Sequence, residues 1–135
     1  MRQLVLAPAQ WEEMRAHVDA CLPLEACGLL AGSADVVQAV IAVPNMARSP
    51  VRFRMDPRAQ WRAFERIEDS GWDLLAIYHS HPAGPDAPSE TDIAEAAYQV
   101  IHLIWSRSNG AWAARGFWID AGRVSDVKLD FIVGA

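Results

Sequence analysis

One apolar run constrains the fold more than any other stretch of this chain: "DLLAIYHSH", residues 73–81. It is apolar at most positions rather than at every second one, which is typical of a strand that is buried on both faces. We therefore expect this run at the centre of a sheet. It ends in two histidines, His79 and His81, so the same strand carries two imidazoles to one edge of that sheet.

The rest of the chain predicts a mixed sheet with about three helices. Apolar residues recur at helical spacing after Pro8 and after Asp56-Pro57, and a third helix is expected over residues 89–99. Trp61 is expected on the apolar side of the second helix, with Phe64 and Ile67. Asn109-Gly110 favours a tight hairpin, so the last third should be an antiparallel meander. The predicted strands are residues 2–7, 27–32, 36–43, 51–55, 73–81, 101–107, 111–119 and 123–133.

Length, charge and cysteine content narrow the class of protein. The 135 residues are 52% hydrophobic and show no linker, so we expect a single domain over residues 1–135. A net charge of -5 without a basic block disfavours nucleic acid as a partner. No apolar run approaches the roughly 20 residues of a membrane span. Cys21 and Cys27 fit neither a redox pair nor a zinc knuckle, so we expect packing thiols in a cytoplasmic protein.

The segment "HSHPAGPDAPSETD", residues 79–92, is the candidate site. Side chains alternate along a strand, so His79 and His81 project from the same face. The Pro/Gly loop allows the chain to reverse, and Asp92 then lies in the first turn of the next helix, where the helix dipole favours a charged carboxylate. Two histidines and one aspartate leave a fourth position for water, which is the pattern of a catalytic zinc site.

The same residues also allow a purely structural interpretation. Ser89 and Asp92 resemble a helix capping box, and strand-end histidines can bond to backbone or water without a metal. Spacing alone leaves both interpretations open, and Ser89 could cap the helix while facing the metal water. For the other two histidines, His17 and His102, we expect structural roles outside the site.

A general base cannot be chosen from composition among seventeen acidic residues. Glu25 stands out only by its neighbours, because it lies between Pro23 and the apolar run "CGLL". A solvated loop carboxylate is the alternative interpretation of this position.

At these residues the chain resembles the JAMM, or MPN-plus, metallopeptidases of the short prokaryotic stand-alone type. The family signature is an upstream glutamate, then His-x-His-Pro, about six residues, and Ser-x-x-Asp. Here the signature is filled by Glu25, by "HSHP" at residues 79–82, and by Ser89 and Asp92. The flanks "PLEACGLLAG", "PNMARSPVRFRMDP" and "LLAIYHSHP" are similar too, so the resemblance covers roughly residues 1–130.

The resemblance implies an α/β (α+β) fold, with a mixed, partly barrel-like sheet flanked by about three helices, of the cytidine-deaminase-like MPN type. It implies that His79, His81 and Asp92 hold one Zn²⁺ per chain, that Glu25 is the general base and acid, and that Ser89 stabilises the oxyanion. The reaction implied is hydrolysis of a peptide or isopeptide bond at the C-terminal Gly-Gly tail of a ubiquitin-like sulfur carrier. A homodimer is compatible with this assignment.

Other classes of protein share parts of this pattern. MPN domains without the full ligand set serve as scaffolds, and two histidines with one carboxylate also form the facial triad of non-haem iron enzymes. Arg52 and Arg54 lie on one face of the predicted strand 51–55, which is either a docking edge for the carrier or an ordinary charged edge. Six Trp hint at aromatic surface for a partner, although core packing is the more common use.

Overall fold

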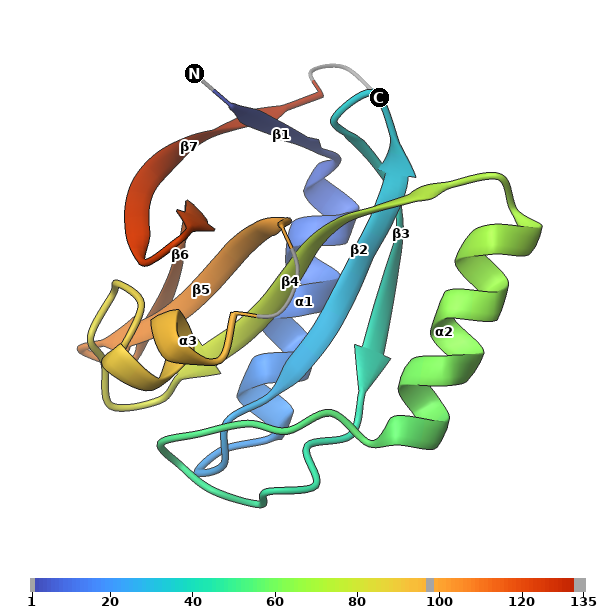
Figure 1. Cartoon of the computed structure of the whole chain (residues 1–135). Helices are drawn as coiled ribbons and strands as arrows, with labels where there is room; N and C mark the ends of the chain where they lie inside the picture. The colour runs from blue at the N-terminus through green and yellow to red at the C-terminus, as the bar shows by residue number, and fades with distance from the viewer. Residues whose placement is uncertain (1, 97–98, 133–135) are drawn as a thin grey trace.

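The computed structural model describes residues 2–96 and 99–132. Its seven strands close into a barrel in the order β1-β3-β2-β4-β5-β6-β7, and three helices lie around it (Figure 1). The predicted class, a mixed and partly barrel-like sheet with about three helices, is confirmed. The strands are β1 (Gln3–Leu6), β2 (Cys27–Ser33), β3 (Val36–Val43), β4 (Asp73–His81), β5 (Ile101–Ser108), β6 (Ala111–Asp120) and β7 (Arg123–Phe131). The helices are α1 (Pro8–Ala20), α2 (Pro57–Asp69) and α3 (Glu90–Ala94).

The apolar run 73–81 is strand β4, and it occupies the central position expected from its composition. It pairs antiparallel with β2 on one side and parallel with β5 on the other. Its residues from Ala76 to His81 are all buried. The strand therefore ends in a buried environment, and the two histidines at its end lie inside the protein.

The C-terminal third is the antiparallel meander that the turn residues predicted. Asn109 and Gly110 both have positive φ values, 53° and 79°, as a tight hairpin requires. Strand β7 then pairs in parallel with β1, from Gln3 opposite Lys128 to Leu6 opposite Phe131. This pairing closes the barrel by joining the first strand of the chain to the last.

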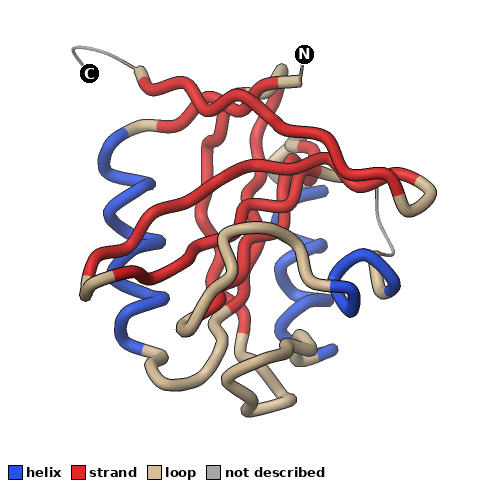
Figure 2. The backbone as a smooth tube through the Cα atoms, turned by 90° about the vertical axis from the view of Figure 1, so that its left-hand side faces the viewer, coloured by secondary structure: helices blue, strands red, loops and turns tan. Residues whose placement is uncertain are grey.

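The two long helices cover opposite sides of the strands (Figures 1 and 2). Helix α1 buries Met14 and Val18 against a core that includes Leu4, Tyr78 and Trp105. Helix α2 buries Ala63 and Ile67 in a second apolar cluster with residues of β2, β3 and β4. Within residues 2–96 and 99–132, no helix combines the length and apolar character needed to cross a membrane.

Three predictions about elements were wrong. Residues 51–55 form a loop instead of an edge strand. The Asn45 side chain hydrogen-bonds to the Arg52 carbonyl and the Arg54 N–H, which are backbone groups that a strand would use to pair with a neighbour. Helix α3 ends at Ala94 and buries none of its residues, so no packed face extends it to 99; Ala97 and Tyr98 lie outside the described residues. Trp61 is 67% exposed and does not contribute to the apolar side of α2.

Candidate metal centre

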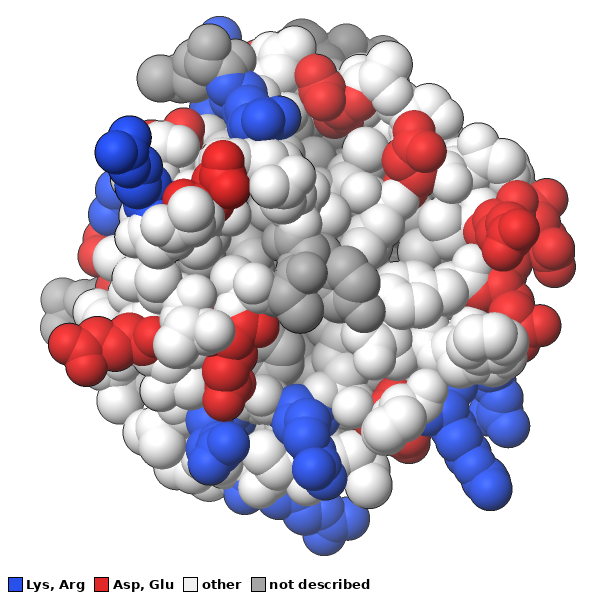
Figure 3. All heavy atoms as spheres, viewed as in Figure 1, with Lys and Arg blue, Asp and Glu red and all other residues white. Residues whose placement is uncertain are grey.

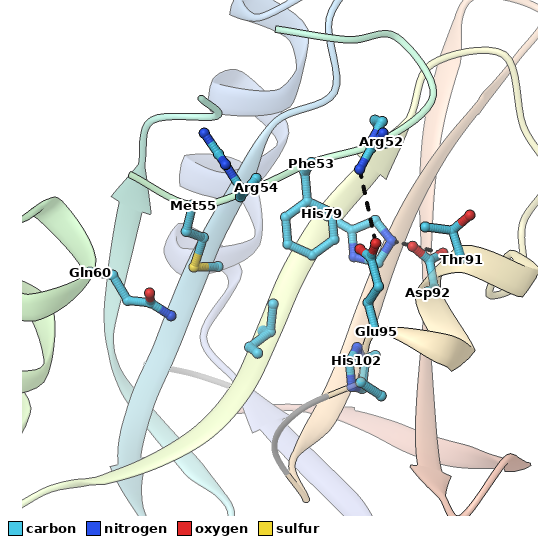
Figure 4. Close-up of a pocket in the computed structure, with 12 residues that line it drawn as sticks. Arg52, Phe53, Arg54, Met55, Gln60, His79, Thr91, Asp92, Glu95 and His102 are labelled. Carbon is cyan, nitrogen blue, oxygen red and sulfur yellow. Dashed lines mark hydrogen bonds and ion pairs between the residues drawn. The ribbon is translucent and has the colours of Figure 1, made fainter. Parts of the chain in front are cut away.

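Strand β4 supplies two converging imidazoles. Ser80 points away, and its hydroxyl accepts a hydrogen bond from the Ala26 N–H at 2.8 Å. His79 and His81 project together from the other face, as the strand period predicts, with 0% and 6% of their surfaces exposed. Their Nε2 atoms are 3.2 Å apart. The ring of Phe53 stacks on His79 with centroids 4.6 Å apart, so an apolar wall fixes one side of the pair (Figure 4).

Helix α3 brings a carboxylate to the same point. Ser89 and Asp92 form the predicted capping box: the Asp92 N–H donates to Ser89 Oγ at 3.0 Å, and the Ser89 N–H donates to Asp92 Oδ2 at 2.8 Å. The same Oδ2 lies 3.2 Å from His79 Nε2 and 3.0 Å from His81 Nε2. The cap therefore aims the carboxylate at the histidines: the predicted capping box is confirmed, and it is compatible with metal binding by the same residues.

The hydrogen bonds of a neutral His81 do not account for this convergence. The Nδ1 of His81 lies 2.8 Å from the Pro85 carbonyl oxygen, a distance at which Nδ1 must carry the proton and donate it. A neutral His81 then presents the lone pair of Nε2 to Asp92 Oδ2, and two acceptors would face each other at 3.0 Å. Only a proton or a metal cation between these atoms makes the contact favourable.

The spacing of the three atoms fits a tetrahedral metal. Two nitrogens and one oxygen lie 3.0 to 3.2 Å from one another. Ligands at about 2.1 Å from a tetrahedral zinc are separated by about 3.3 Å. The donor set is the one that zinc takes in catalytic sites, and the Pro85 carbonyl supplies the outer hydrogen bond that fixes the His81 tautomer.

Glu25 provides a second carboxylate on the other side of the histidines. Its side chain is only 1% exposed, and its ligand atom lies within 4.8 Å of those of His79 and His81. The backbone is fixed on both sides, because the Glu25 N–H donates to the Ser49 carbonyl at 2.8 Å and the Glu25 carbonyl accepts from Asn45 Nδ2 at 2.9 Å. Asp92 is therefore the nearer carboxylate and Glu25 the more distant one.

Burial and the neighbouring charges shift the pKa values of Glu25, Asp92 and His79. Burial raises the pKa of Glu25 to about 8, with Asp92 adding to the rise and His81 opposing it, and Oε1 has no hydrogen-bond partner among the described residues. Burial also disfavours a charged Asp92, but its contacts with His79 and His81 outweigh that effect and hold its pKa far below the usual range. Burial lowers the pKa of His79. Asp92 is thus an anion and His79 a neutral ligand at neutral pH.

A cavity of about 270 Å³ opens beside His79 and Asp92 (Figure 4). Loop residues 52–55 form one wall, and Thr91, Glu95 and Ala96 form the opposite one. His102 lines its floor and is only 5% exposed, with neither ring nitrogen paired within the described part of the chain. From the sequence, His102 was expected outside the site. In the parallel pairing of β4 with β5 it lies opposite Ile77, two residues before His79, and this pairing, which the spacing along the chain does not show, brings it to the cavity.

The remaining candidates have structural roles. His17 Nδ1 lies 2.7 Å from the Tyr78 hydroxyl, in the interface between α1 and the sheet. Cys27 is fully buried, and burial raises the pKa of its thiol to about 12, with the nearby Glu25 adding to the rise. A thiol with so high a pKa is not a nucleophile at neutral pH, so the prediction that Cys27 is a packing residue is confirmed.

Comparison with known proteins identifies the family to which the chain belongs. The family of prokaryotic homologs of the JAB domain matches residues 8–120. The chain belongs to this family. The predicted resemblance to the JAMM metallopeptidases is thereby confirmed, and the assignment of the chain to the hydrolases with it.

Two curated relatives of this JAB-domain chain are named as proteases. A probable TtuB-protein conjugate cleaving protease of Thermus thermophilus is 42% identical over 113 residues, which are 83% of this chain and 73% of the relative. A CysO-cysteine peptidase of Mycobacterium bovis is 32% identical over 123 residues, 88% of this chain and 84% of the relative. A solution structure of a protein from Desulfitobacterium hafniense matches with a TM-score of 0.87 and 35% identity, covering 96% and 93% of the two chains.

Proposed function

We propose that this JAB-domain protein is a zinc-dependent peptidase or isopeptidase that hydrolyses the amide bond at the C-terminal Gly-Gly tail of a ubiquitin-like sulfur carrier. The observation that carries the proposal is the convergence of His79 Nε2, His81 Nε2 and Asp92 Oδ2 at 3.0 to 3.2 Å, with the Glu25 carboxylate nearby. In this proposal His79, His81 and Asp92 hold the metal. A bound zinc ion would lower the pKa of a water to about 7 and polarise the scissile carbonyl.

Glu25 is suited to carry the proton in this reaction. Its burial raises the pKa to about 8, so the group can accept and release a proton near neutral pH. The carboxylate takes a proton from the attacking water and returns it to the departing amine. Because the backbone of Glu25 is hydrogen-bonded on both sides, the carboxylate is held in place through both steps.

Ser89 is suited to stabilise the oxyanion. Its Oγ already accepts the Asp92 N–H, and its own hydroxyl proton remains available as a donor. The cap thus orients the hydroxyl before substrate arrives, and such preorganised donors are worth most where negative charge develops.

The names of the relatives favour a carrier tail as the substrate but differ in the leaving group. One relative is named for cleaving protein conjugates of TtuB and the other for releasing cysteine from CysO. An extended Gly-Gly tail has no side chains and fits a narrow approach to a buried site. Our proposal for this chain is therefore amide hydrolysis directly after such a tail.

Elemental analysis of the protein purified without added metal tests the site, with Asp92→Ala in parallel. We expect about one zinc per chain, lost or much weakened in the variant. The cleavage assay uses a β-grasp sulfur carrier that ends in Gly-Gly and is extended by one cysteine. Glu25→Gln should keep the metal and stop cleavage. Iron with oxygen-dependent turnover would identify a non-haem iron enzyme, and absence of metal would reduce the motif to a strand end and a helix cap.

Four further predictions from the sequence stay predictions. They are a single domain over residues 1–135, a cytoplasmic location, the absence of nucleic-acid and membrane partners, and compatibility with a homodimer. Each concerns the protein outside its catalytic site, so none alters the chemistry proposed above.

A further inference from the structure

Positive charge is concentrated in one segment of an otherwise acidic chain. Of the twelve Lys and Arg residues, six lie within residues 48–66, and only Asp56 and Glu65 oppose them there. All six are exposed. Lys and Arg side chains gather along the lower edge of the molecule in Figure 3, where Figure 1 places the loop before α2 and the first turns of α2. The six are Arg48, Arg52, Arg54, Arg58, Arg62 and Arg66.

The charges of α2 are arranged against the stability of the helix. A helix dipole favours acidic residues in the first turn and basic residues in the last. Here the first turn has no acidic residue and carries Arg58, and Glu68 and Asp69 lie in the last turn; only the N-cap Asp56 and Arg66 in the last turn follow the rule. Neither Arg58 nor Arg62 has an ion-pair partner among the described residues. Charges placed against the helix dipole do not stabilise α2, so we infer that these arginines serve contacts with another molecule.

Large apolar side chains are exposed between these arginines. Trp61 is 67% exposed, Val51 75% and Met46 50%. Trp61 lies in a shallow hollow with Arg58 and Arg62. Aromatic residues, Met and Arg are the residue types enriched in protein interfaces, and Trp and Arg dominate their energetic centres. We call the surface formed by Met46, Val51, Trp61 and the five arginines from Arg48 to Arg62 the basic face.

The basic face is continuous with the cavity at the candidate metal centre. Arg52, Arg54 and Gln60 line that cavity, and Gln60 is followed directly by Trp61 on α2 (Figure 4). Arg52 also contacts Glu95 across the cavity at 3.9 Å, an exposed and therefore weak ion pair that a ligand can displace. A protein seated on the basic face is thus adjacent to the entrance of the site.

We propose that the basic face docks the acidic surface of the carrier domain whose C-terminal tail enters the cavity. This inference rests on the proposed function and adds the partner's chemistry: net negative charge around an apolar centre that covers Trp61. A protein is favoured over nucleic acid because the apolar side chains of Met46 and Val51 are exposed in the loop before α2 and because the whole chain carries a charge of -5.

The test compares a whole carrier with its tail alone. The first substrate is a β-grasp sulfur carrier of net negative charge that ends in Gly-Gly-Cys, and the second is a peptide of its last six residues. The variants are Trp61→Ala and the double variant Arg58→Glu with Arg62→Glu. The controls are Val124→Ala, which truncates an exposed apolar side chain on β7, and Arg123→Glu, which reverses the charge of an exposed arginine on the same strand.

We expect each basic-face variant to raise KM for the whole carrier about tenfold or more, with kcat unchanged and kcat/KM for the peptide unchanged. The controls should match the parent with both substrates. Parent-like KM values for the carrier in both variants, with carrier and peptide still cleaved, would overturn only the docking surface. Failure of the parent to cleave either substrate would overturn the proposed function as well. Binding of a 20-nucleotide single-stranded RNA that only the Arg58/Arg62 variant loses, with carrier KM unchanged, would assign the face to nucleic acid.

Discussion

Glu25 is a carboxyl group in a place where a carboxylate is unfavourable. It is 1% exposed, and its Oε1 has no hydrogen-bond partner among the described residues. Because the pKa in the folded protein is about 8, well above the ordinary value of 4.5, ionisation opposes folding in the metal-free protein. The contribution of Glu25 to stability falls as pH rises from about 4.5 to 8 and is constant above that range.

Glu25→Gln should therefore stabilise the metal-free protein. The amide cannot ionise, so the difference between a pKa of about 8 and the ordinary 4.5 sets an upper limit of about 5 kcal/mol on the gain in unfolding free energy at pH 8, and we expect Tm to rise by roughly 10 °C or more. The gain should become small near pH 4.5, where the carboxyl of the folded parent is protonated and that of the unfolded chain is about half protonated. Thermal melts in a chelator from pH 4.5 to 8.5 measure it; a gain that does not depend on pH would show that charge is not its cause.

At the residue scale, local sequence patterns could identify some of the candidate site residues but not all of them. His79, His81, Ser89 and Asp92 were identifiable because strand and helix periodicity place them within one short segment. Glu25 carries no local signal of its chemistry, and only the resemblance to the JAMM family selected it. His102 was misplaced because it reaches the cavity through parallel pairing of β5 with β4, which the spacing of residues along the chain does not reveal.

At the scale of elements, one side chain organises the loop from Pro44 to Met55. Asn45 donates to the carbonyls of Glu25 and Arg52, and its Oδ1 accepts from the N–H groups of Ala47 and Arg54, all within 2.9 to 3.1 Å. The loop that carries Phe53 onto His79 is therefore hydrogen-bonded to the segment before β2 that carries Glu25. The local sequence could not show this, because an alternating "VRFRM" pattern is equally compatible with a strand.

Asn45→Ala should release this loop without unfolding the barrel. Each of the four lost hydrogen bonds costs about 1 kcal/mol, so we expect a loss of stability of about 4 kcal/mol in total. Limited proteolysis should cut between residues 46 and 54 faster than in the parent, and cleavage of the carrier substrate should fall at least tenfold. Gln38→Ala, at an exposed position of β3, is the control. Unchanged proteolysis would show that other contacts hold the loop.

Strand β2 approaches the ring of Tyr78 so closely that it requires glycine. A Cβ added at Gly28 would overlap the side chain of Tyr78, which is fully buried and whose hydroxyl lies 2.7 Å from His17 Nδ1. Neither group has room to move, because α1 packs above them. The close approach keeps β2 and β4 in the register that places Cys27 beside His79.

Gly28→Ala should destabilise the protein by about 3 kcal/mol or more, measured by urea unfolding. Adding Tyr78→Leu to this variant frees the space of the ring, so the double variant should lose less stability than the sum of the two single changes. Strict additivity would mean that the overlap with Tyr78 is not the source of the cost.

The helices, the central strand and the meander could be predicted because their signals are local. Pro8, Asp56-Pro57 and Asn109-Gly110 fix starts and turns through the conformations that these residues favour. Helix α3 was predicted too long because its alanines favour a helix wherever they occur, whereas the observed helix has no buried face to extend it. Closure of the barrel was implied only through family resemblance, since β1 and β7 lie at opposite ends of the chain.

For the whole molecule, the proposed metal centre joins elements that otherwise have few contacts. Helix α3 buries none of its residues, and its Asp92 is the link to the end of β4. A ligand that binds only the folded state stabilises it by mass action, by about 2.7 kcal/mol at a hundredfold excess over Kd.

Chelation should accordingly lower the Tm of the zinc-loaded parent by roughly 10 °C. Hydrogen exchange should rise in residues 82–96 more than in the core strands, because these residues are held by the site rather than by packing. Asp92→Ala should show no response to the chelator. A uniform rise in exchange across the barrel would mean that the metal stabilises the whole fold instead of this segment.

The parallel pairing of β1 with β7 has a practical consequence. Because β1 and β7 run side by side in the same direction, Gln3 and Phe131 lie at opposite ends of the pair, and Figure 1 shows the whole pair on the side of the molecule away from the loop before α2. An affinity handle or surface anchor attached through either strand therefore holds the molecule by the side opposite the basic face. Immobilised protein should keep both the entrance of the cavity and the approach of a large substrate unobstructed, whichever strand carries the anchor.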